Sequence, residues 1–472
     1  MQRILLGFIL FRFNLQTFPA FDPSHGIGHS PRPVFYLLGG EISMKVLVIG
    51  GGGREHALAW KATQSAGVEM VFVAPGNAGT AREPGIKNVD VAANDIPALL
   101  EFALNEKIEL TIVGPEVPLV AGVVDTFANA DLRCFGPTKG AAQLEGSKAF
   151  TKDFLARHQI PTAAYGNFTE IEPALTYIKE QGAPIVIKAD GLAAGKGVIL
   201  AQTEDEANAA VKDMLAGNAF GDAGHRVVIE EFLQGEEASF IVMVDGEHIL
   251  PMASSQDHKT RDEGDRGPNT GGMGAYSPAP VVTPAMHDRI MHEVIEPTVK
   301  GMAAEGNPFT GFLYAGVMIN AEGIPKVLEY NVRFGDPETQ PIIMRLKSDL
   351  VALCDAALDG RLHEVKAEWD ERTALGVVLA AGGYPDSYRK GDEITGLPSD
   401  SDENSKVFHA GTATEKDGTV VTSGGRVLCA VGLGETVGEA QKQAYTLADR
   451  IHWEGVFCRR DIGYRAIARE NK

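Results

Sequence analysis

The chain has 472 residues, and at about 150 residues per domain this length predicts roughly three compact units. Hydrophobic residues make up 44% of it and charged residues 22%, as in ordinary globular proteins, and the apolar run at residues 4–11 is too short to span a membrane. The net charge of -20 disfavours nucleic acid as a partner, because an acidic surface repels phosphate backbones. Four scattered cysteines indicate neither a disulfide framework nor a zinc site, and they favour a reducing compartment, the cytoplasm.

Residues 1–43 show neither helical nor alternating periodicity, and they contain four prolines. They match a signal peptide only loosely, so we expect a disordered leader or an over-long translation start rather than a targeting segment. The folded protein is predicted to begin at Met44, which opens a clean apolar strand.

Residues 44–144 alternate short apolar strands with helices, which is typical of a small doubly wound α/β domain with a parallel sheet. The helices are predicted at 54–65 and 96–108. A glycine run, Gly50 to Gly53, joins the first strand to the first helix, where backbone amides and the helix dipole favour an anion. Glu55 or His56 stands where a dinucleotide-binding fingerprint requires its third glycine, which argues against a nicotinamide enzyme. A tight turn without a ligand is the alternative.

After a helix predicted at 147–160, the pattern changes to strands placed back to back, with Asp245-Gly246 as a hairpin signal. The middle of the chain is therefore predicted to be α+β with antiparallel sheet, an architecture different from that of the first domain.

A second glycine loop runs from Lys188 to Gly197. It resembles a P-loop but has three residues between its glycines instead of four, and Gly197 replaces the required Ser or Thr. Because an apolar strand follows, we predict a flap between two strands, whose amides and Lys196 cover phosphates while Lys188 supplies a point charge. A surface hairpin without function is the alternative.

Residues 257–276 interleave Asn269 and Thr270 with several glycines, a pattern that can form a concave set of backbone donors for a carboxylate or phosphate. A disordered linker is the alternative, because the stretch is polar and rich in glycine. His258 lies in this block, but no Cys or His spacing makes it a metal ligand.

The strand predicted at 327–333 places Glu329, Asn331 and Arg333 on one face, because side chains alternate along a strand. Glu and Asn oxygens suit Mg²⁺, which completes its coordination with nucleotide phosphates and water. Arg333 can hold a transferred phosphoryl group with two hydrogen bonds. A plain exposed strand face is the alternative.

A last unit from about residue 372 has apolar strands and a helix predicted at 437–451, with little reactive chemistry. The expected domains are 44–144, 145–371 with a flap subdomain at about 161–235, and 372–472. Since no second catalytic block follows, we expect one activity.

Three motifs, at 187–198, 267–278 and 333–340, resemble in this order those of the ATP-grasp ligases and, among them, the phosphoribosylamine–glycine ligase family. The resemblance implies an N-terminal doubly wound domain, a central ATP-grasp fold and a small C-terminal α+β domain. It also implies ATP-dependent ligation of glycine to 5-phosphoribosylamine through glycyl phosphate, with Mg²⁺ or Mn²⁺, in de novo purine biosynthesis. Such chemistry relies on positioning and charge neutralisation and needs no covalent enzyme intermediate.

The resemblance further implies roles for individual residues. The ATP-binding set comprises Lys148, Lys188, Gly191, Gly195, Lys196, Gly197, Glu230, Phe232, Leu233 and Glu237. Within it, Glu230 and the 232–233 backbone correspond to the adenine site and Glu237 to the ribose-binding acid. Glu329 and Asn331 correspond to metal ligands, and Arg333 with Lys188 to catalytic residues. The substrate-binding set comprises Gly51, Gly52, Gly53, Arg54, Glu116, Asp257, Lys259, Asn269, Thr270, Gly271 and Gly272.

One departure from the wider superfamily is that the strand before Glu329 reads Gly316-Val317-Met318-Ile319 and offers no second carboxylate, which argues against a two-metal arrangement. The alternative functions are another ATP-grasp carboxylate–amine ligase and, from a different class, a nucleotide-binding regulatory module. The expected partners are small molecules, without nucleic acid, membrane or an obligate protein partner.

Overall fold

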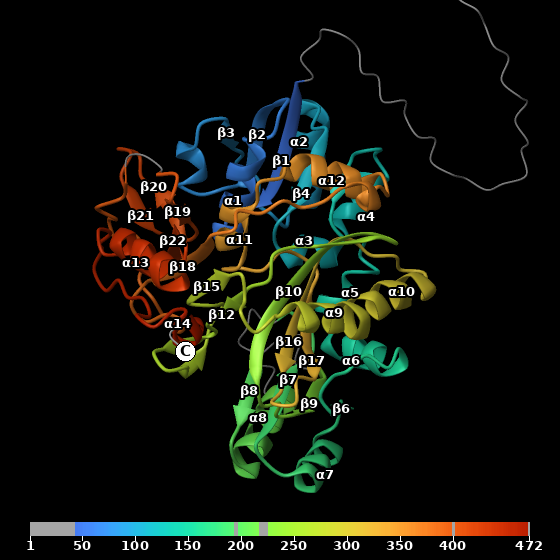
Figure 1. The fold of residues 1–472 in the computed structure, drawn as a ribbon. Coiled ribbons are helices and arrows are strands. Elements are labelled where there is room, and N and C mark those ends of the chain that lie inside the picture. The colour runs from blue at the N-terminus through green and yellow to red at the C-terminus, as the bar shows by residue number, and fades with distance from the viewer. Residues whose placement is uncertain (1–42, 193–196, 217–224, 399–401, 471–472) are drawn as a thin grey trace, which may run out of the picture. The chain divides into compact units, whose positions relative to one another are not determined.

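The computed structural model in Figure 1 describes residues 43–192, 197–216, 225–398 and 402–470. The predicted leader lies outside the described residues apart from Ser43. In the described ranges, no helix combines the length and the apolar character needed to cross a bilayer.

The N-terminal sheet is parallel, with strand order β3-β2-β1-β4-β5. Its elements are β1 (Met44–Gly50), α1 (Gly53–Ala62), β2 (Val68–Pro75), β3 (Ile86–Asn88), α2 (Ile96–Glu106), β4 (Leu110–Val113), α3 (Glu116–Ala121), α4 (Val123–Ala128) and β5 (Cys134–Phe135). Residues 46–49 of β1 are fully buried, which explains their continuous apolar run. Because parallel strands end at one edge, the glycine loop after β1 and Gly76 after β2 lie side by side, with Gly76 N donating to Gly50 O at 3.2 Å.

A four-stranded antiparallel sheet, β6-β9-β7-β8, carries the predicted flap. Its elements are β6 (Tyr165–Phe168), α7 (Ile171–Gln181), β7 (Ile185–Ala189), β8 (Val198–Ala201), α8 (Glu204–Ala216) and β9 (Val227–Glu231). The glycine loop joins β7 to the antiparallel β8, as predicted, with Lys188 opposite Val198. Helices α5 (Gln143–Gly146) and α6 (Lys148–Arg157) precede this sheet in the chain.

A second antiparallel sheet, β11-β10-β16-β17, carries the predicted metal-binding strand at its edge. Its strands are β10 (Glu236–Asp245), β11 (Ile249–Pro251), β16 (Thr310–Ile319) and β17 (Pro325–Asn331). The Asp245-Gly246 hairpin is confirmed, since β10 turns there into β11. Near this sheet lie α9 (Pro284–Ile290), a π-helical turn (Met291–Ile295), α10 (Glu296–Ala304) and α12 (Leu350–Leu358), whereas α11 (Thr339–Arg345) packs against α1 and the third sheet described below.

The third sheet has the order β12-β15-β18-β22-β19. Its strands are β12 (Gln256–Asp257), β15 (Gly274–Ser277), β18 (Thr373–Ala380), β19 (Ser405–His409) and β22 (Arg426–Gly434). Helix α13 (Val437–Ala448) packs against β18 and β22, and α14 (Tyr464–Glu470) follows it (Figure 1). Two hairpins, β13 (Thr260–Asp262) with β14 (Arg266–Asn269) and β20 (Thr412–Thr414) with β21 (Val420–Thr422), extend from the same region. This sheet therefore combines strands from the middle of the chain with C-terminal strands, because β15 pairs with the free edge of β18.

Four predicted helices are confirmed, but α1, α2, α6 and α13 each end two or three residues earlier than the periodicity indicated. At α2 the reason is local: Lys107 adopts a left-handed conformation with φ 58, and its N–H caps the helix. Gln159, two residues past the end of α6, also adopts a left-handed conformation, with φ 56.

The predicted strand over 327–333 ends earlier than expected, because β17 stops at Asn331 and Arg333 lies in the bend that follows it. Aromatic side chains join the N-terminal sheet to this segment. Phe135 of β5 meets Phe312 of β16 edge to face at 5.0 Å between ring centroids, and Phe312 meets Phe334 at 4.7 Å. All three are at most 5% exposed. Their packing places the segment after β17 against the N-terminal domain.

Candidate active site

Two lysines share one buried carboxylate at the base of the flap sheet. Glu230 of β9 lies 2.8 Å from Lys152 Nζ and 2.9 Å from Lys188 Nζ, with only 2% of its side chain exposed. Lys188 Nζ also donates to the carbonyl of Leu328, the residue before Glu329, at 3.2 Å. Burial lowers the pKa of Lys152 to about 8, against the opposing charge of Glu230. The predicted Lys188 and Glu230 are thus in contact, and they lie beside β17, the strand of the predicted metal ligands.

The entrance to the flap is held by Lys148 and Asp190. Lys148, the first residue of α6, donates from Nζ to the carbonyl of Gly191 at 2.7 Å, and burial lowers its pKa. Ser147 caps α6 by accepting from Phe150 N and also donates to Asp190 at 3.1 Å. Gly191 and Gly197 lie at the two ends of the loop, whereas Gly195 and Lys196 lie outside the described residues.

Phe232 and Leu233, just after β9, have peptide groups that can bind a ligand. No hydrogen bond engages the backbone of Phe232 or Leu233 within the part of the chain that the structure describes, and both residues are half-buried. Free backbone donors and acceptors next to the buried Glu230 suit the flat, polar edge of a nucleobase.

Lys259 connects β17 to β10. Its ammonium contacts the Glu237 carboxylate and lies 3.5 Å from Glu329 Oε1. Burial would raise the pKa of Glu329, but the positive charges of Lys259, Lys188 and Lys148 outweigh it and hold the pKa at about 2. Glu329 is therefore ionised at neutral pH, although 38% of its side chain remains exposed.

Asn331 and Asp257 complete this region. Asn331 lies two residues after Glu329, and its side chain makes no hydrogen bond to any described residue. Burial, together with the charges of Glu338, Glu237 and Glu329, raises the pKa of Asp257 well above its ordinary value, despite Lys259. Among the described residues no cluster of three His, Cys, Asp or Glu side chains can hold a metal by itself. As expected, β16 supplies no carboxylate, since Gly316 lies opposite Glu329 in the ladder.

Arg333 stands at the junction with the N-terminal domain. Its guanidinium lies 3.4 Å from Glu116 and 3.1 Å from Glu145, and Arg54 donates to the neighbouring Phe334 carbonyl at 3.3 Å. Burial raises the pKa of Glu145 to about 7, although Arg333 and the Val332 N–H, at 2.7 Å, favour its ionised form. The predicted Arg54, Glu116 and Arg333 are thus brought together, and the structure adds Glu145 to them.

A cavity of about 370 Å³ lies between the glycine loop and the C-terminal domain. Its lining includes Gly51, Gly52, Gly76, Asp336, Gly411 and Arg426. A side chain at position 51 would place its Cβ 2.7 Å from the Gly76 carbonyl oxygen, so this wall must be glycine. Gly53 is the first residue of α1 and does not line the cavity. Arg54, buried behind it, pairs with Glu55 at 2.5 Å.

Arg426 links this cavity to the 269–272 loop. Its guanidinium donates to the carbonyls of Gly271 and Asp336 and pairs with the Asp336 carboxylate at 2.6 Å. A Cβ at Gly272 would lie 2.4 Å from the Pro337 ring, so this loop packs directly on the segment after Arg333. Thr270 donates to the carbonyl of Lys259 at 2.8 Å. Asn269 ends β14, where it pairs with Thr260.

Three residues of this candidate site were not predicted from the sequence: Lys152, Glu145 and Arg426. Lys152 stands one helical turn after Lys148, a spacing that places both on one face of α6 and could have indicated it. Glu145 and Arg426 had no local signal, because their partners are distant in the chain.

The chain matches three family models along its length. Residues 44–145 match the N domain, residues 146–339 the ATP-grasp (A) domain and residues 374–465 the C domain of phosphoribosylglycinamide synthetase. The chain is 72% identical over 427 residues to a phosphoribosylamine–glycine ligase of Escherichia coli O6:H1, covering 90% of this chain and all of the relative. It is 73% identical, with the same coverage, to that of Salmonella typhimurium.

Solved structures of similar proteins support the same family. A phosphoribosylamine–glycine ligase from Thermotoga maritima superposes with a TM-score of 0.76 at 38% identity and covers 89% of this chain and all of its own. A biotin carboxylase domain from Hydrogenobacter thermophilus superposes with a TM-score of 0.69 over 88% of this chain and 91% of its own, but at 15% identity it shows the fold alone. With three matched domains in the same order and relatives identical at most positions, the chain belongs to the phosphoribosylglycinamide synthetase family of ATP-grasp ligases.

Proposed function

We propose that the site performs ATP-dependent ligation of glycine to 5-phosphoribosylamine, giving glycinamide ribonucleotide, ADP and phosphate. Family membership supports this reaction in purine biosynthesis. The observation that carries the assignment to this site is the convergence of Lys188, Lys259 and Glu329, which joins the flap sheet to the strand after which Arg333 stands.

ATP lies, in this proposal, between the flap sheet and β17. Glu230 and the free peptide groups at 232–233 bind adenine, and Glu237 binds the ribose. Lys148 and Lys188 bind the phosphates, joined by Gly191, Gly197 and by the predicted Gly195 and Lys196 of the flap. A triphosphate here would replace the contact of Lys148 with the Gly191 carbonyl by a stronger, charge-assisted one.

A divalent cation, Mg²⁺ or Mn²⁺, would be held by Glu329 and Asn331. The residues fit this ion, because Glu329 is ionised and the Asn331 amide has no other partner among the described residues. When bound, the ion would neutralise charge on the phosphates.

Activation of glycine requires phosphorylation of a carboxylate, which is by itself a poor electrophile. Arg333 would hold the transferred phosphoryl group, since a guanidinium donates in a planar fork. The ammonium and carboxylate groups of glycine are contacted, in this proposal, by the set Asp257, Lys259, Asn269, Thr270, Gly271 and Gly272. The amine of the second substrate then attacks glycyl phosphate and displaces phosphate.

The phosphoribosyl group is assigned to the glycine-lined cavity. Gly51, Gly52 and Arg426 offer backbone amides and a guanidinium, and the volume of about 370 Å³ suits a sugar phosphate. Gly53 and Arg54 begin α1, whose N-terminus adds a favourable dipole. Glu116, assigned to the same substrate, pairs with Arg333 at 3.4 Å.

The enzyme is proposed to work in the cytoplasm, on small molecules. Its four cysteines, Cys134, Cys354, Cys429 and Cys458, are all free thiols, which suits a reducing compartment.

The test is ADP release with MgATP, glycine and phosphoribosylamine, each omitted in turn. Turnover is expected only with all three. ADP release that continues at full rate without glycine would reject the assignment, and turnover with another amino acid at equal kcat/KM would reject its specificity.

A further inference from the structure

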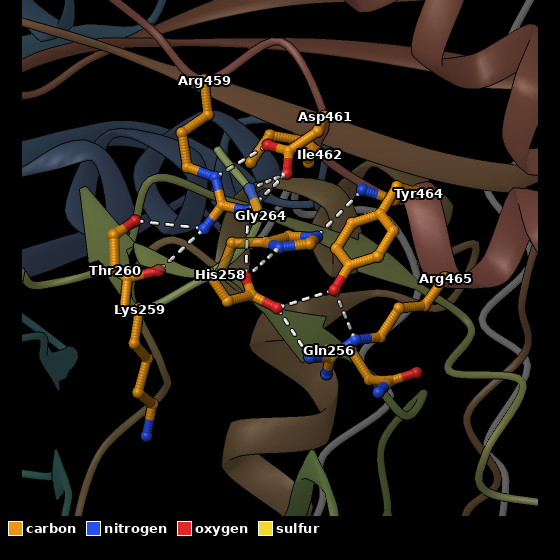
Figure 2. Close-up of polar contacts among 12 residues, drawn as sticks. Gln256, His258, Lys259, Thr260, Gly264, Arg459, Asp461, Ile462, Tyr464 and Arg465 are labelled. Atoms are coloured by element: carbon orange, nitrogen blue, oxygen red, sulfur yellow. Dashed lines mark hydrogen bonds and ion pairs between the residues drawn. The ribbon is translucent and has the colours of Figure 1, made fainter. Parts of the chain in front are cut away.

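The hairpin β13–β14 is anchored to the C-terminal segment 459–465 through a buried polar network (Figure 2). The network centres on His258, which is 5% exposed, and on Arg459, which is fully buried at 1% exposure. None of the residues that face the proposed ATP site takes part in it. Its hydrogen bonds must therefore serve another purpose than binding nucleotide.

His258 uses both ring nitrogens. Gly463 N donates to His258 Nε2 at 2.9 Å, so this nitrogen carries a lone pair and the proton resides on Nδ1. Nδ1 faces Asp265 Oδ1 at 3.5 Å. Burial lowers the pKa of His258, which keeps the ring neutral and its Nε2 free to accept. The imidazole thus joins the C-terminal segment to the turn of the hairpin.

Arg459 reinforces the same connection. It donates to the carbonyl and hydroxyl oxygens of Thr260 at 3.1 and 3.0 Å, and to Asp265 at 2.9 Å. Asp461 holds Arg459 in place at 2.8 Å and also accepts from Gly264 N at 2.8 Å. The guanidinium therefore fixes the first residue of β13, which directly follows Lys259.

Lys259 points the other way. Figure 2 shows its side chain leaving the strand away from the network, while His258 and Thr260 face into it. Such alternation is what an extended segment imposes. On its own side Lys259 contacts Glu237 and lies 3.5 Å from Glu329. Any shift of the strand that carries His258 would therefore move the Lys259 ammonium within the proposed active site.

We propose that His258 and Arg459 are positioning residues, through which the C-terminal segment fixes Lys259 between Glu237 and Glu329. This inference rests on the proposed function. Neither residue touches substrate: each acts through the backbone of 258–260. The C-terminal domain then contributes to catalysis in two ways, by lining the phosphoribosyl cavity and by holding a lysine at the glycine site.

The first test compares two variants of His258. His258→Leu keeps the bulk but removes the acceptor for Gly463 N, whereas His258→Gln offers an amide oxygen near the position of Nε2. We expect H258L to lower kcat about a hundredfold, because small misplacements of positioned groups have effects of this size. The KM for ATP should change less than kcat, since Lys148, Lys188 and Glu230 lie outside the network and Lys259 reaches the ATP site only through Glu237. H258Q should recover at least a tenth of the lost kcat. Equal losses of kcat in both variants would overturn the proposal.

The second test asks whether the effect passes through Lys259. In a K259A background, whose residual turnover is measured at high enzyme concentration, H258L should lower kcat less than threefold further. A full hundredfold additional loss would mean that His258 acts by a different route.

A third, independent test uses Arg459→Lys, which also replaces H258L if that variant does not fold. It should lower kcat about tenfold, since Lys cannot reproduce the fork to Thr260 and Asp265. Arg460→Lys is the matched control: this neighbour is half-exposed, pairs with Asp449 and should leave kcat unchanged. Glycine-dependent turnover by the wild type and R460K tests the proposed function separately. An unchanged kcat in R459K with that turnover intact would refute the positioning role alone.

Discussion

Two regions of the molecule bind anions, in our proposal, by different physical means. The nucleotide-side cluster (Lys148, Lys152, Lys188 and Glu230) uses charged side chains: Lys152 and Lys188 are buried and pair with Glu230, and Lys148 donates to the Gly191 carbonyl. The glycine-lined cavity uses backbone amides together with the guanidinium of Arg426. The first region comes from one continuous stretch of about 80 residues, and the second from segments spread between Gly51 and Arg426 along the chain.

The difference has an electrostatic consequence. Burial lowers the pKa of Lys148 and Lys152, so the cationic state of the nucleotide-side cluster depends on nearby carboxylates and on the ligand. Backbone amides do not titrate, and the pKa of Arg426 is raised by Asp336 even against burial. The cavity should therefore keep its charge over the whole working pH range, whereas the nucleotide-side cluster should not.

We expect the largest effect at Glu329, which lies between the lysines of the nucleotide side and the proposed metal site. Glu329→Gln removes a carboxylate held ionised by three lysines, and we expect kcat/KM to fall about a thousandfold, or about 4 kcal/mol. Steady-state kinetics over a range of Mg²⁺ concentrations check this. Glu231→Gln, at an exposed ion pair with Lys326, is the control and should change little. Unaltered metal dependence in E329Q would remove Glu329 from the metal site.

The next effect concerns Glu145, at the junction of the two regions. Its pKa of about 7 lies above the ordinary value near 4.3, so between these pH values the native protein retains a proton that the unfolded chain releases. The stability of the wild type relative to Glu145→Gln should therefore fall as pH rises from about 4.5 to about 7, by about 3 kcal/mol, and stay constant above.

Urea unfolding of both proteins at several pH values measures this difference. Glu106→Gln, at a surface pair with Lys45, serves as the control. A difference between wild type and E145Q that rises with pH in this interval would show that Arg333 dominates over burial at Glu145.

A smaller effect should separate the two regions directly. Arg426→Ala removes the guanidinium of the cavity and should raise the KM for phosphoribosylamine about thirtyfold, or about 2 kcal/mol, with the KM for ATP unchanged. Calorimetric binding of ribose 5-phosphate gives the same comparison without turnover. Arg389→Ala, on the exposed surface of the same domain, should behave as wild type. A rise in both KM values would indicate that the regions are coupled.

The smallest effect concerns the helix start beside the flap. Ser147→Ala and Thr436→Ala each remove an N-cap, of α6 and α13, and each should lower the free energy of unfolding by about 1 kcal/mol. Only S147A should also raise the KM for ATP, because Ser147 donates to Asp190 at the flap entrance. Equal KM values in the two variants would mean that this contact is purely structural.

Much of the nucleotide side could be predicted from the sequence. Glu329 and Asn331 lie on one short strand, and Lys188 directly precedes the glycine loop, so their chemistry is visible in local spacing. The cavity could be predicted only in part. Gly51 and Gly52 follow a strand in a recognisable way, but nothing near Arg426 indicates that it meets Asp336, which is 90 residues away.

The sequence by itself determined the three-domain organisation, the flap between two strands and the residue types of the proposed metal site. These follow from periodicity and from neighbours a few residues apart, which fix local backbone geometry and which face a side chain takes. Only the tertiary structure decided that β15 joins the C-terminal sheet, that Glu145 pairs with Arg333 and that His258 is held by Gly463. Such contacts depend on which sheet edges and buried polar groups remain unsatisfied once the elements pack, and that is a property of the whole fold.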